Sequence, residues 1–263
     1  MARIFSGPGG NIAPNIISSL KSLKELGLDC QEIEFVHGVT MGQKKAQEAG
    51  RLAKELGLKL SVHAPYYINL LSPEEEKVSA SKKRILDSCR RGHDMGASAI
   101  VFHPGFYQKR TKKESYSIVK EQIADLLKSI KSEGLDVELC PETTGKGSQF
   151  GDVDELLSIM SETKCGICVD FAHIFARQNG EIDYVGLFEK FKKHKLRHIH
   201  CHFSGIEYSE KGERNHLQMT DEFAMPLLEA ASDSGIDLTI INESPNPLKG
   251  AIDLKVLASR YGL

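Results

Sequence analysis

The sequence has no apolar run long enough to cross a membrane and no hydrophobic leader at its N-terminus. The opening residues, Met1–Phe5, are too few and are followed by too polar a segment to act as a signal peptide. Membrane-spanning helices need about 20 apolar residues, and no segment approaches that length. We therefore expect a cytoplasmic protein without a membrane partner.

The chain has six cysteines, and their placement argues against a disulfide framework. Most of the six cysteines lie in apolar, strand-like runs, where a buried thiol is the usual state. Cys165 and Cys168 have the CxxC spacing of a zinc knuckle, but no second CxxC accompanies them. We expect buried thiols here and no zinc knuckle.

The chain also lacks a strong net charge. Its formal charge is −2, which neither indicates nor excludes a nucleic-acid partner, because a basic binding face can occur on a neutral protein. Local basic clusters are present at Lys44–Lys45, Lys82–Arg84 and Lys109–Arg110. Each is, by itself, typical of a solvated helix face.

Short β-rich runs alternate with amphipathic helical stretches along the chain. Ile16, Leu20 and Leu23, for example, recur at helical spacing. Such alternation predicts parallel strands joined by right-handed crossovers, and eight units fit the usual size of an α/β TIM (β/α)8 barrel. The predicted strands are Ala2–Phe5, Gln31–Val36, Lys59–His63, Ala99–His103, Val137–Pro141, Gly166–Asp170, His198–Phe203 and Leu238–Asn242.

No linker, low-complexity segment or change in composition interrupts this pattern, so we predict a single domain over residues 1–263. An open, doubly wound sheet is the alternative α/β architecture. It is less favoured because no Gly-x-Gly-x-x-Gly follows the first strand, and Gly7–Gly10 does not have that fingerprint.

Histidine and carboxylate side chains gather at the C-terminal ends of predicted strands 3 to 8, where TIM barrels carry their chemistry. One histidine at a strand end is usually a hydrogen-bonded loop residue, but six consecutive strands with such ends need another explanation. Imidazoles mixed with carboxylates favour Zn²⁺, Mn²⁺ or Fe²⁺ over Mg²⁺ or Ca²⁺, and their number suggests two or three ions. The candidates are His63, His103, Glu142, Asp170, His173, His200, His202 and Glu243.

Strand 7 carries His198, His200 and His202, which are spaced by two and therefore face the same way. His198 is deepest and is expected to be structural. Either His200 or His202 is nearest the mouth of the barrel.

Several segments resemble the endonuclease IV family (AP endonuclease family 2), which cuts DNA at abasic sites. The similarity covers most of the chain, from strand 2 to strand 8. The segments His202–Tyr208 and Gly212–Leu217 resemble the shorter, archaeal-type branch of that family. The remaining matching segments are Ser61–Leu70, Phe102–Gly105, Pro141–Gly151 and Cys168–His173.

The resemblance implies a site with three zinc ions. The implied ligands of the first ion are His63, His103 and Glu142. Those of the second ion are Glu142, Asp170, Glu243 and His200, which is preferred to His202. Those of the third ion are His173 and His216. The family has an aspartate two positions before the last histidine, where this chain has Arg214. Glu213, three positions before His216, is the nearest carboxylate and the candidate substitute.

The resemblance further implies a DNA repair endonuclease of base excision repair, active as a monomer on duplex DNA with abasic sites. Metal-activated water would hydrolyse the phosphodiester 5′ to the lesion, with Glu142 and Glu243 as the catalytic carboxylates. Tyr66 matches the position of a side chain that the family wedges into the duplex. The other expected DNA contacts are Gln43, Lys44, Lys109 and Arg110.

A xylose-isomerase-like sugar isomerase or epimerase is the main alternative. Glu142, Asp170, His200 and Glu243 would satisfy its pattern of one or two metal ions. The additional histidines at the same mouth favour the nuclease, because a sugar enzyme has no evident need for them. A non-catalytic, metal-dependent DNA-binding protein is the third possibility considered.

Overall fold

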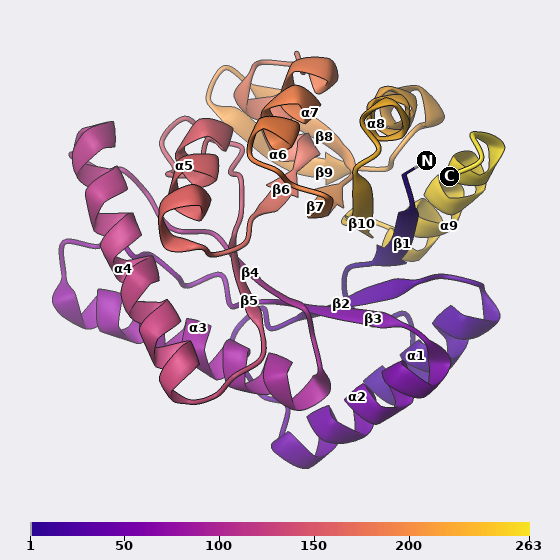
Figure 1. The fold of residues 1–263 in the computed structure, drawn as a ribbon, viewed down its shortest axis with the longest axis horizontal. Coiled ribbons are helices and arrows are strands. Elements are labelled where there is room, and N and C mark those ends of the chain that lie inside the picture. Colours follow the sequence, from indigo (N-terminus) through magenta and orange to yellow (C-terminus); the bar gives the residue numbers. More distant parts are fainter. Residues whose placement is uncertain (1) are drawn as a thin grey trace.

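Eight parallel strands surrounded by helices form a barrel in the computed structural model, which describes residues 2–263 (Figure 1). The predicted TIM barrel is confirmed, and the predicted strand positions differ from the observed ones only at their ends. The barrel strands are β1 (Ile4–Pro8), β2 (Cys30–Glu34), β3 (Lys59–His63), β4 (Ala99–Phe102), β5 (Glu138–Pro141), β6 (Cys168–Asp170), β7 (His198–Phe203) and β10 (Asp237–Asn242).

The barrel consists of two four-stranded parallel sheets, ordered β1-β10-β7-β6 and β2-β3-β4-β5. Two seams join them. At the first seam, the Gly10 amide donates to the Glu32 carbonyl at 3.0 Å, which ties β1 to β2. At the second, the Thr143 amide donates to the Cys168 carbonyl at 3.1 Å, which ties β5 to β6. These bonds close the ring of strands.

The helices cover the outside of the barrel with their apolar faces inward. In α1, Ile16, Leu20 and Leu23 are buried as the spacing predicts. Full burial of such a side chain stabilises the fold by roughly 1.5–3 kcal/mol. The helices are α1 (Ile16–Glu25), α2 (Gln43–Leu56), α3 (Glu75–Met95), α4 (Lys112–Ser132), α5 (Val153–Thr163), α6 (Phe171–Arg177), α7 (Tyr184–Lys193), α8 (Asp221–Ser234) and α9 (Pro247–Arg260).

A β-hairpin that the periodicity did not predict lies between β7 and α8. Its strands, β8 (Gly205–Ser209) and β9 (Gly212–Leu217), pair in antiparallel fashion. Glu207 pairs with Asn215 and Tyr208 pairs with Glu213, so Arg214 is an extra residue in β9. Side chains alternate between the faces of a strand, and one extra residue shifts that alternation by one position. Glu213 and His216 therefore share a face although they are three residues apart.

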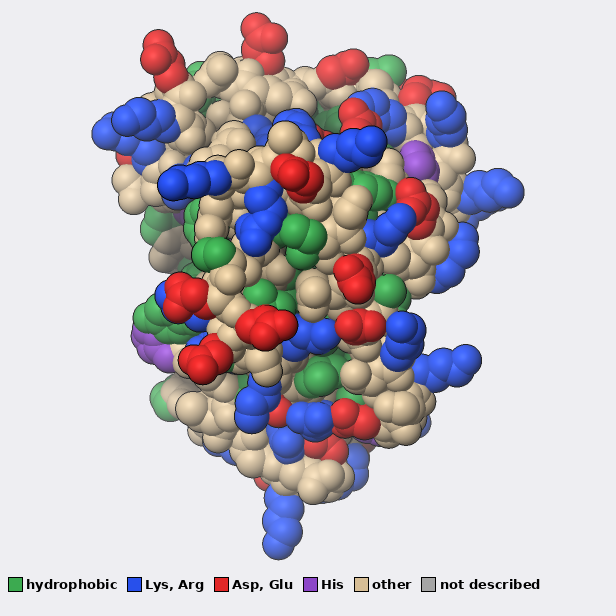
Figure 2. All heavy atoms as spheres, turned by 90° about the vertical axis from the view of Figure 1, so that its left-hand side faces the viewer, with side chains coloured by type: hydrophobic (Ala, Val, Ile, Leu, Met, Phe, Trp, Pro, Cys, Tyr) green, Lys and Arg blue, Asp and Glu red, His purple; other side chains and the backbone are tan. Residues whose placement is uncertain are grey.

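Acidic and basic side chains are interspersed on the face formed by α3, α4 and α5, which Figure 2 shows. Lys82 pairs with Asp125 at 3.2 Å and Lys120 with Glu162 at 2.9 Å. This mixture agrees with the small net charge. None of the helices in residues 2–263 is long and apolar enough to span a membrane. All six cysteines are free and buried, which confirms the prediction of thiols.

Candidate metal centre

Glu142, at the end of β5, is the centre of a cluster of histidines. Its carboxylate is almost wholly buried, with 1% of its side chain exposed. Oε2 lies 3.1 Å from His63 Nε2 and 2.9 Å from His103 Nε2. Oε1 lies 3.3 Å from both His173 Nδ1 and His202 Nδ1. The structure thus brings four of the predicted histidines around one predicted carboxylate.

Asp170 and His173 are held together by the start of α6. Asp170 is the N-cap of this helix, and its Oδ1 accepts the His173 amide at 2.7 Å. An N-cap carboxylate satisfies one of the unpaired amides at a helix start. The other carboxylate oxygen, Oδ2, lies 3.2 Å from His173 Nδ1 and faces the cluster.

Two histidines of β7, His200 and His202, lie at different depths in the barrel. His202 Nδ1 is 3.3 Å from Glu142 Oε1 and also 3.3 Å from Glu243 Oε1. His200 instead pairs with Glu32, with Nε2 2.9 Å from Oε2. The structure therefore places His202 beside Glu142 and Glu243, whereas the register of the resemblance favoured His200. His198, the deepest, has Nε2 2.8 Å from Thr239 Oγ1 and lies apart from the cluster, as expected.

The β8–β9 hairpin adds Glu213 and His216 to the cluster. Glu213 Oε2 lies 3.6 Å from His173 Nε2, and its Oε1 lies 3.3 Å from Lys146 Nζ. The His216 ring centre is 5.6 Å from that of His173. The bulge at Arg214 explains why the carboxylate comes three positions before the histidine, because it places both side chains on one face.

Three further residues at the centre were not among the sequence candidates. Glu32 and Glu34 extend from β2 into the barrel, and Cys168 lies on β6 beside His200 and His202. Glu32 is wholly buried, and Glu34 lines the same cavity as His63 and Glu142. Two carboxylates spaced by two within a predicted strand were the available signal, because they must share one face.

Burial and the neighbouring charges strongly shift the pKa values of the groups in the cluster. Burial raises the pKa of Glu243 to about 8 and that of Glu34 to about 6. Burial alone would lower the pKa of His63, but its bond to Glu142 and the surrounding carboxylates raise it to about 10. For Glu142 the nearby histidines outweigh burial and hold its pKa well below the usual range. The cluster therefore retains protons that water-exposed groups would release.

The arrangement of the donor atoms fits divalent metal ions. Buried polar atoms nearly always have a hydrogen-bond partner, yet several here have none. They are Glu142 Oε1, Asp170 Oδ2, Glu213 Oε2 and His202 Nδ1, together with Glu32 Oε1 and His202 Nε2, which lie 2.8 Å apart without the alignment of a hydrogen bond. Ligand atoms that lie within 4.8 Å of one another occur in the groups His63/His103/Glu142, Glu142/Asp170/His173, Glu32/His202/Glu243 and Cys168/His200/His202. Imidazole and carboxylate donors in such groups suit zinc and other transition metals.

A cavity of about 190 Å³ opens above the cluster. Its walls include His63, Glu142, Tyr66 and Arg214. Tyr66 is 63% exposed, so its ring is available at the rim. Arg214 was not among the predicted DNA contacts, because only the hairpin brings it to the mouth.

The other predicted DNA contacts differ in their surroundings. The Gln43 amide donates to Asp94 Oδ1 at 2.9 Å, and Arg110 donates to the Leu71 carbonyl, so both side chains already have partners within the protein. Lys44 and Lys109 are exposed to solvent. None of these four lines the cavity.

Sequence comparisons identify two relatives of interest. The uncharacterized protein MJ0133 of Methanocaldococcus jannaschii is 39% identical over 253 residues, which cover 92% of each chain. The probable endonuclease 4 of Malacoplasma penetrans is 30% identical over 190 residues, which cover 66% of this chain and 64% of the relative.

Solved structures with the same fold include enzymes of two kinds. Endonuclease IV from Thermus thermophilus superposes with a TM-score of 0.74 at 18% identity, covering 99% of this chain and 100% of the other. The 3-keto-D-glucoside 4-epimerase YcjR from E. coli superposes with a TM-score of 0.69 at 16% identity, covering 99% and 100%. At these identities the likeness concerns the fold alone.

The family assignment rests on the length of the sequence match. A sequence model of xylose isomerase-like TIM barrels matches residues 20–258, which is most of the chain. The resemblance to AP endonuclease family 2 is thereby confirmed at the level of the family. The chain belongs to the xylose isomerase-like TIM barrel family.

Proposed function

We propose that this protein is a metal-dependent DNA repair endonuclease that hydrolyses the phosphodiester 5′ to an abasic site. The observation that carries the proposal is the convergence of His63, His103, His173 and His202 on Glu142. So many imidazoles around one carboxylate exceed what a single ion requires. The similarity to a probable endonuclease 4 supports a DNA substrate.

Three groups of side chains would hold the ions, for which zinc is the best fit. Because His202 lies beside Glu142 and Glu243, we place it in the second group instead of His200. Because the bulge brings Glu213 beside His173, we place it in the third. The groups are His63, His103 and Glu142; Glu142, Asp170, His202 and Glu243; and His173, His216 and Glu213.

Bound divalent ions would neutralise the scissile phosphate and lower the pKa of a water molecule. The protein's own contribution is to orient the ligands and to handle protons. Glu142 faces four imidazoles and cannot turn away without losing its contacts with all of them. Glu243 lies at the wall of the cavity beside His202, where it would hold an ion or, when displaced from the ion, accept a proton from the attacking water.

The decisive experiment is incision of a duplex oligonucleotide that carries one abasic-site analogue. The protein is assayed as purified, after metal removal by a chelator, and after zinc is restored. We expect a nick 5′ to the analogue that disappears with the metal and returns with zinc. Zinc-loaded protein that leaves the duplex intact would contradict the proposal.

A sugar epimerase or isomerase is the second candidate function. Glu142, Asp170, His202 and Glu243 form a compact group that would suffice for one or two ions, and YcjR shares the fold. The same metal-loaded protein is therefore incubated with ketoses and aldoses. Conversion of a sugar by protein that does not nick DNA would favour this candidate.

Tyr66→Ala is expected to weaken binding to abasic DNA by about tenfold, because stacking of one aromatic ring contributes ~1–3 kcal/mol. The ring lies at the rim of the cavity and supplies no metal ligand, so zinc content should not change. Binding is measured by fluorescence anisotropy in chelator, which prevents incision.

Tyr67→Ala is the matched control for this change. Tyr67 is also 63% exposed, but it stacks on His37 with ring centres 6.3 Å apart and does not line the cavity. Equal losses in the two variants would show that Tyr66 has no special role in binding DNA.

Gly145→Ala is expected to weaken the third group of ligands. A Cβ atom at Gly145 would lie 1.8 Å from Glu213 Oε2, so the carboxylate must move away. We expect at least one zinc ion fewer per chain, measured by mass spectrometry after dialysis.

Gly147→Ala is a control in the same loop, because a Cβ at Gly147 meets nothing within 4 Å. Its zinc content should equal that of the wild type. If Gly145→Ala also keeps every ion, Glu213 is not a ligand.

A further inference from the structure

Glu32 lies on β2 inside the barrel, wholly buried, with its carboxylate between two histidines of β7. Oε1 is 2.8 Å from His202 Nε2, and Oε2 is 2.9 Å from His200 Nε2. Within residues 2–263 these histidines are its only ion-pair partners, since no lysine or arginine lies within 4.0 Å. Nothing in the proposed ligand groups explains why a carboxylate is buried at this depth.

We propose that Glu32 is a positioning residue that fixes the tautomer and orientation of His202, and that His200 supports Glu32 instead of binding a metal ion. This inference rests on the metal-binding part of the proposed function. It does not depend on which substrate the protein acts on.

The chemistry of a neutral imidazole carries the argument. Such a ring has one N–H donor and one nitrogen with a free electron pair, and an ionised carboxylate can only accept. A carboxylate oxygen 2.8 Å from Nε2 repels a free electron pair there and attracts a proton, so Glu32 selects the form of His202 that has its proton on Nε2. Nδ1, which lies 3.3 Å from oxygens of both Glu142 and Glu243, is then the nitrogen whose electron pair can bind an ion. A carboxylate that holds the remote nitrogen of a histidine is a recurrent way to orient a metal ligand.

The two oxygens of Glu32 explain the presence of His200. With one oxygen close to each imidazole, the carboxylate cannot rotate without losing its hydrogen bond to His200 or its 2.8 Å contact with His202. His200 Nε2 bonds to Glu32 Oε2, and it is His202 that lies beside Glu142. His200 thus holds the Glu32 carboxylate in place below the proposed ligands.

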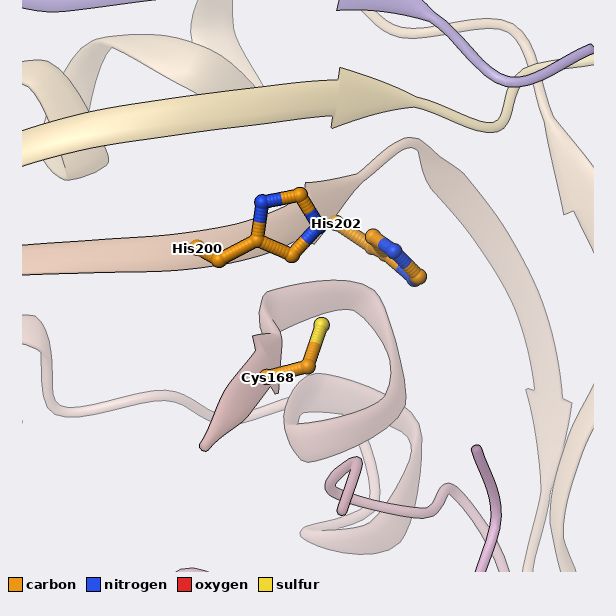
Figure 3. Close-up of side chains that lie close together, drawn as sticks. All are labelled: Cys168, His200 and His202. Carbon is orange, nitrogen blue, oxygen red and sulfur yellow. The ribbon is translucent and has the colours of Figure 1, made fainter. Parts of the chain in front are cut away.

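A deeper metal ion is the competing explanation of the same residues. Cys168 is in register with His200 on the neighbouring strand, and Figure 3 shows its sulfur pointing toward the two histidines. The ligand atoms of Cys168, His200 and His202 lie within 4.8 Å of one another. Such an ion would have a thiolate ligand, which gives a spectroscopic test.

Glu32→Gln distinguishes a role of Glu32 in positioning His202 from a role in packing, because it removes the charge and preserves the shape of the side chain. A carboxamide can accept from one imidazole, but its NH₂ group then faces the N–H of the other. We expect affinity for zinc, measured by chelator competition, to fall about 10–100-fold. In the zinc-loaded protein the His202 Nε2–H proton should move upfield in NMR spectra, because its carboxylate acceptor is lost. Glu32→Asp, which keeps the charge, should recover part of the affinity.

His200→Gln is the matched variant, since its amide can still donate to Glu32. Its affinity for zinc should equal that of the wild type, and both variants are first checked for folding by circular dichroism. Two results would overturn the inference: Glu32→Gln with unchanged zinc affinity and an unmoved His202 proton, or His200→Gln with one ion lost. Wild-type protein that binds no metal would overturn it together with the proposed function, whereas metal binding without incision would contradict only the nuclease.

Cobalt substitution tests the competing thiolate site directly. If Cys168 binds an ion, the Co²⁺ form will show thiolate-to-cobalt charge-transfer absorption that disappears in Cys168→Ser and persists in Cys201→Ser. That result would assign His200 to a deeper ion and overturn the inference. Absence of the band from the Co²⁺-loaded wild type would support it.

Discussion

Glu142→Gln is expected to remove metal binding at the mouth and to lower incision of abasic DNA by about a thousandfold or more. An amide carries no charge and cannot bridge two cations, and metal ions contribute several kcal/mol to such reactions, with about 1.4 kcal/mol per tenfold change. The change also leaves four histidines without their common partner. Zinc content and single-turnover incision are measured on the same preparation.

Glu138→Gln is the control on the same strand. Glu138 is the first residue of β5 and contacts none of the mouth histidines, so zinc content and incision should match the wild type. A Glu142→Gln protein that keeps all its ions and its nicking activity would exclude Glu142 as the bridging ligand.

The metal-free protein is expected to become less stable as the pH rises from 6 to 10. Glu243 and His63 have folded-state pKa values of about 8 and about 10, above their usual values of 4.5 and 6.5. A group whose pKa is raised by folding stabilises the protein fully below its unfolded pKa, and that contribution is lost as the pH passes the folded value. Glu32 and Glu142 have depressed pKa values, so their contribution is lost only on acidification below about 4.5.

Thermal melts at pH 6 and pH 9 test this expectation. We expect the Tm of metal-free protein to be at least about 5 °C lower at pH 9, since each pKa unit corresponds to ~1.4 kcal/mol. In zinc-loaded protein the difference should shrink or reverse, because metal replaces the protons and binds more tightly as they leave. Glu243→Gln should flatten the loss between pH 6 and 8. An equal or higher Tm at pH 9 in the metal-free wild type would contradict the assigned direction.

The elements that depend on local pattern could be predicted from the sequence. The spacing of Ile16, Leu20 and Leu23 predicts α1 and its buried face. Gly57 and Gly96, which precede β3 and β4, have positive φ values of 71° and 68° at the ends of α2 and α3. The ends of parallel strands meet at one end of a barrel, so the meeting of His63, His103 and Glu142 could also be expected.

The features that depend on distant contacts could not be predicted in the same way. His200 and His202 share a face, so spacing alone leaves open which one lies level with Glu142; that depends on how far β7 extends along the barrel axis. Glu32 meets His200 across 168 residues of sequence, and no local pattern records such a pairing. The bulge at Arg214 arises from the pairing of β8 with β9. Matching this sequence to a family motif position by position gives no information about how two strands pair, so the bulge could not be predicted.

The two seams of the barrel give the metal centre a second role. Glu142 pairs with Cys168 at the seam between β5 and β6, and Glu32 pairs with Gly9 at the seam between β1 and β2. The proposed ligands come from both half-barrels, with His63 on one and His202 on the other. Ions bound between them would act as cross-links between two halves whose strands meet through only a few backbone bonds. The same atoms that perform the chemistry would then hold the cylinder closed.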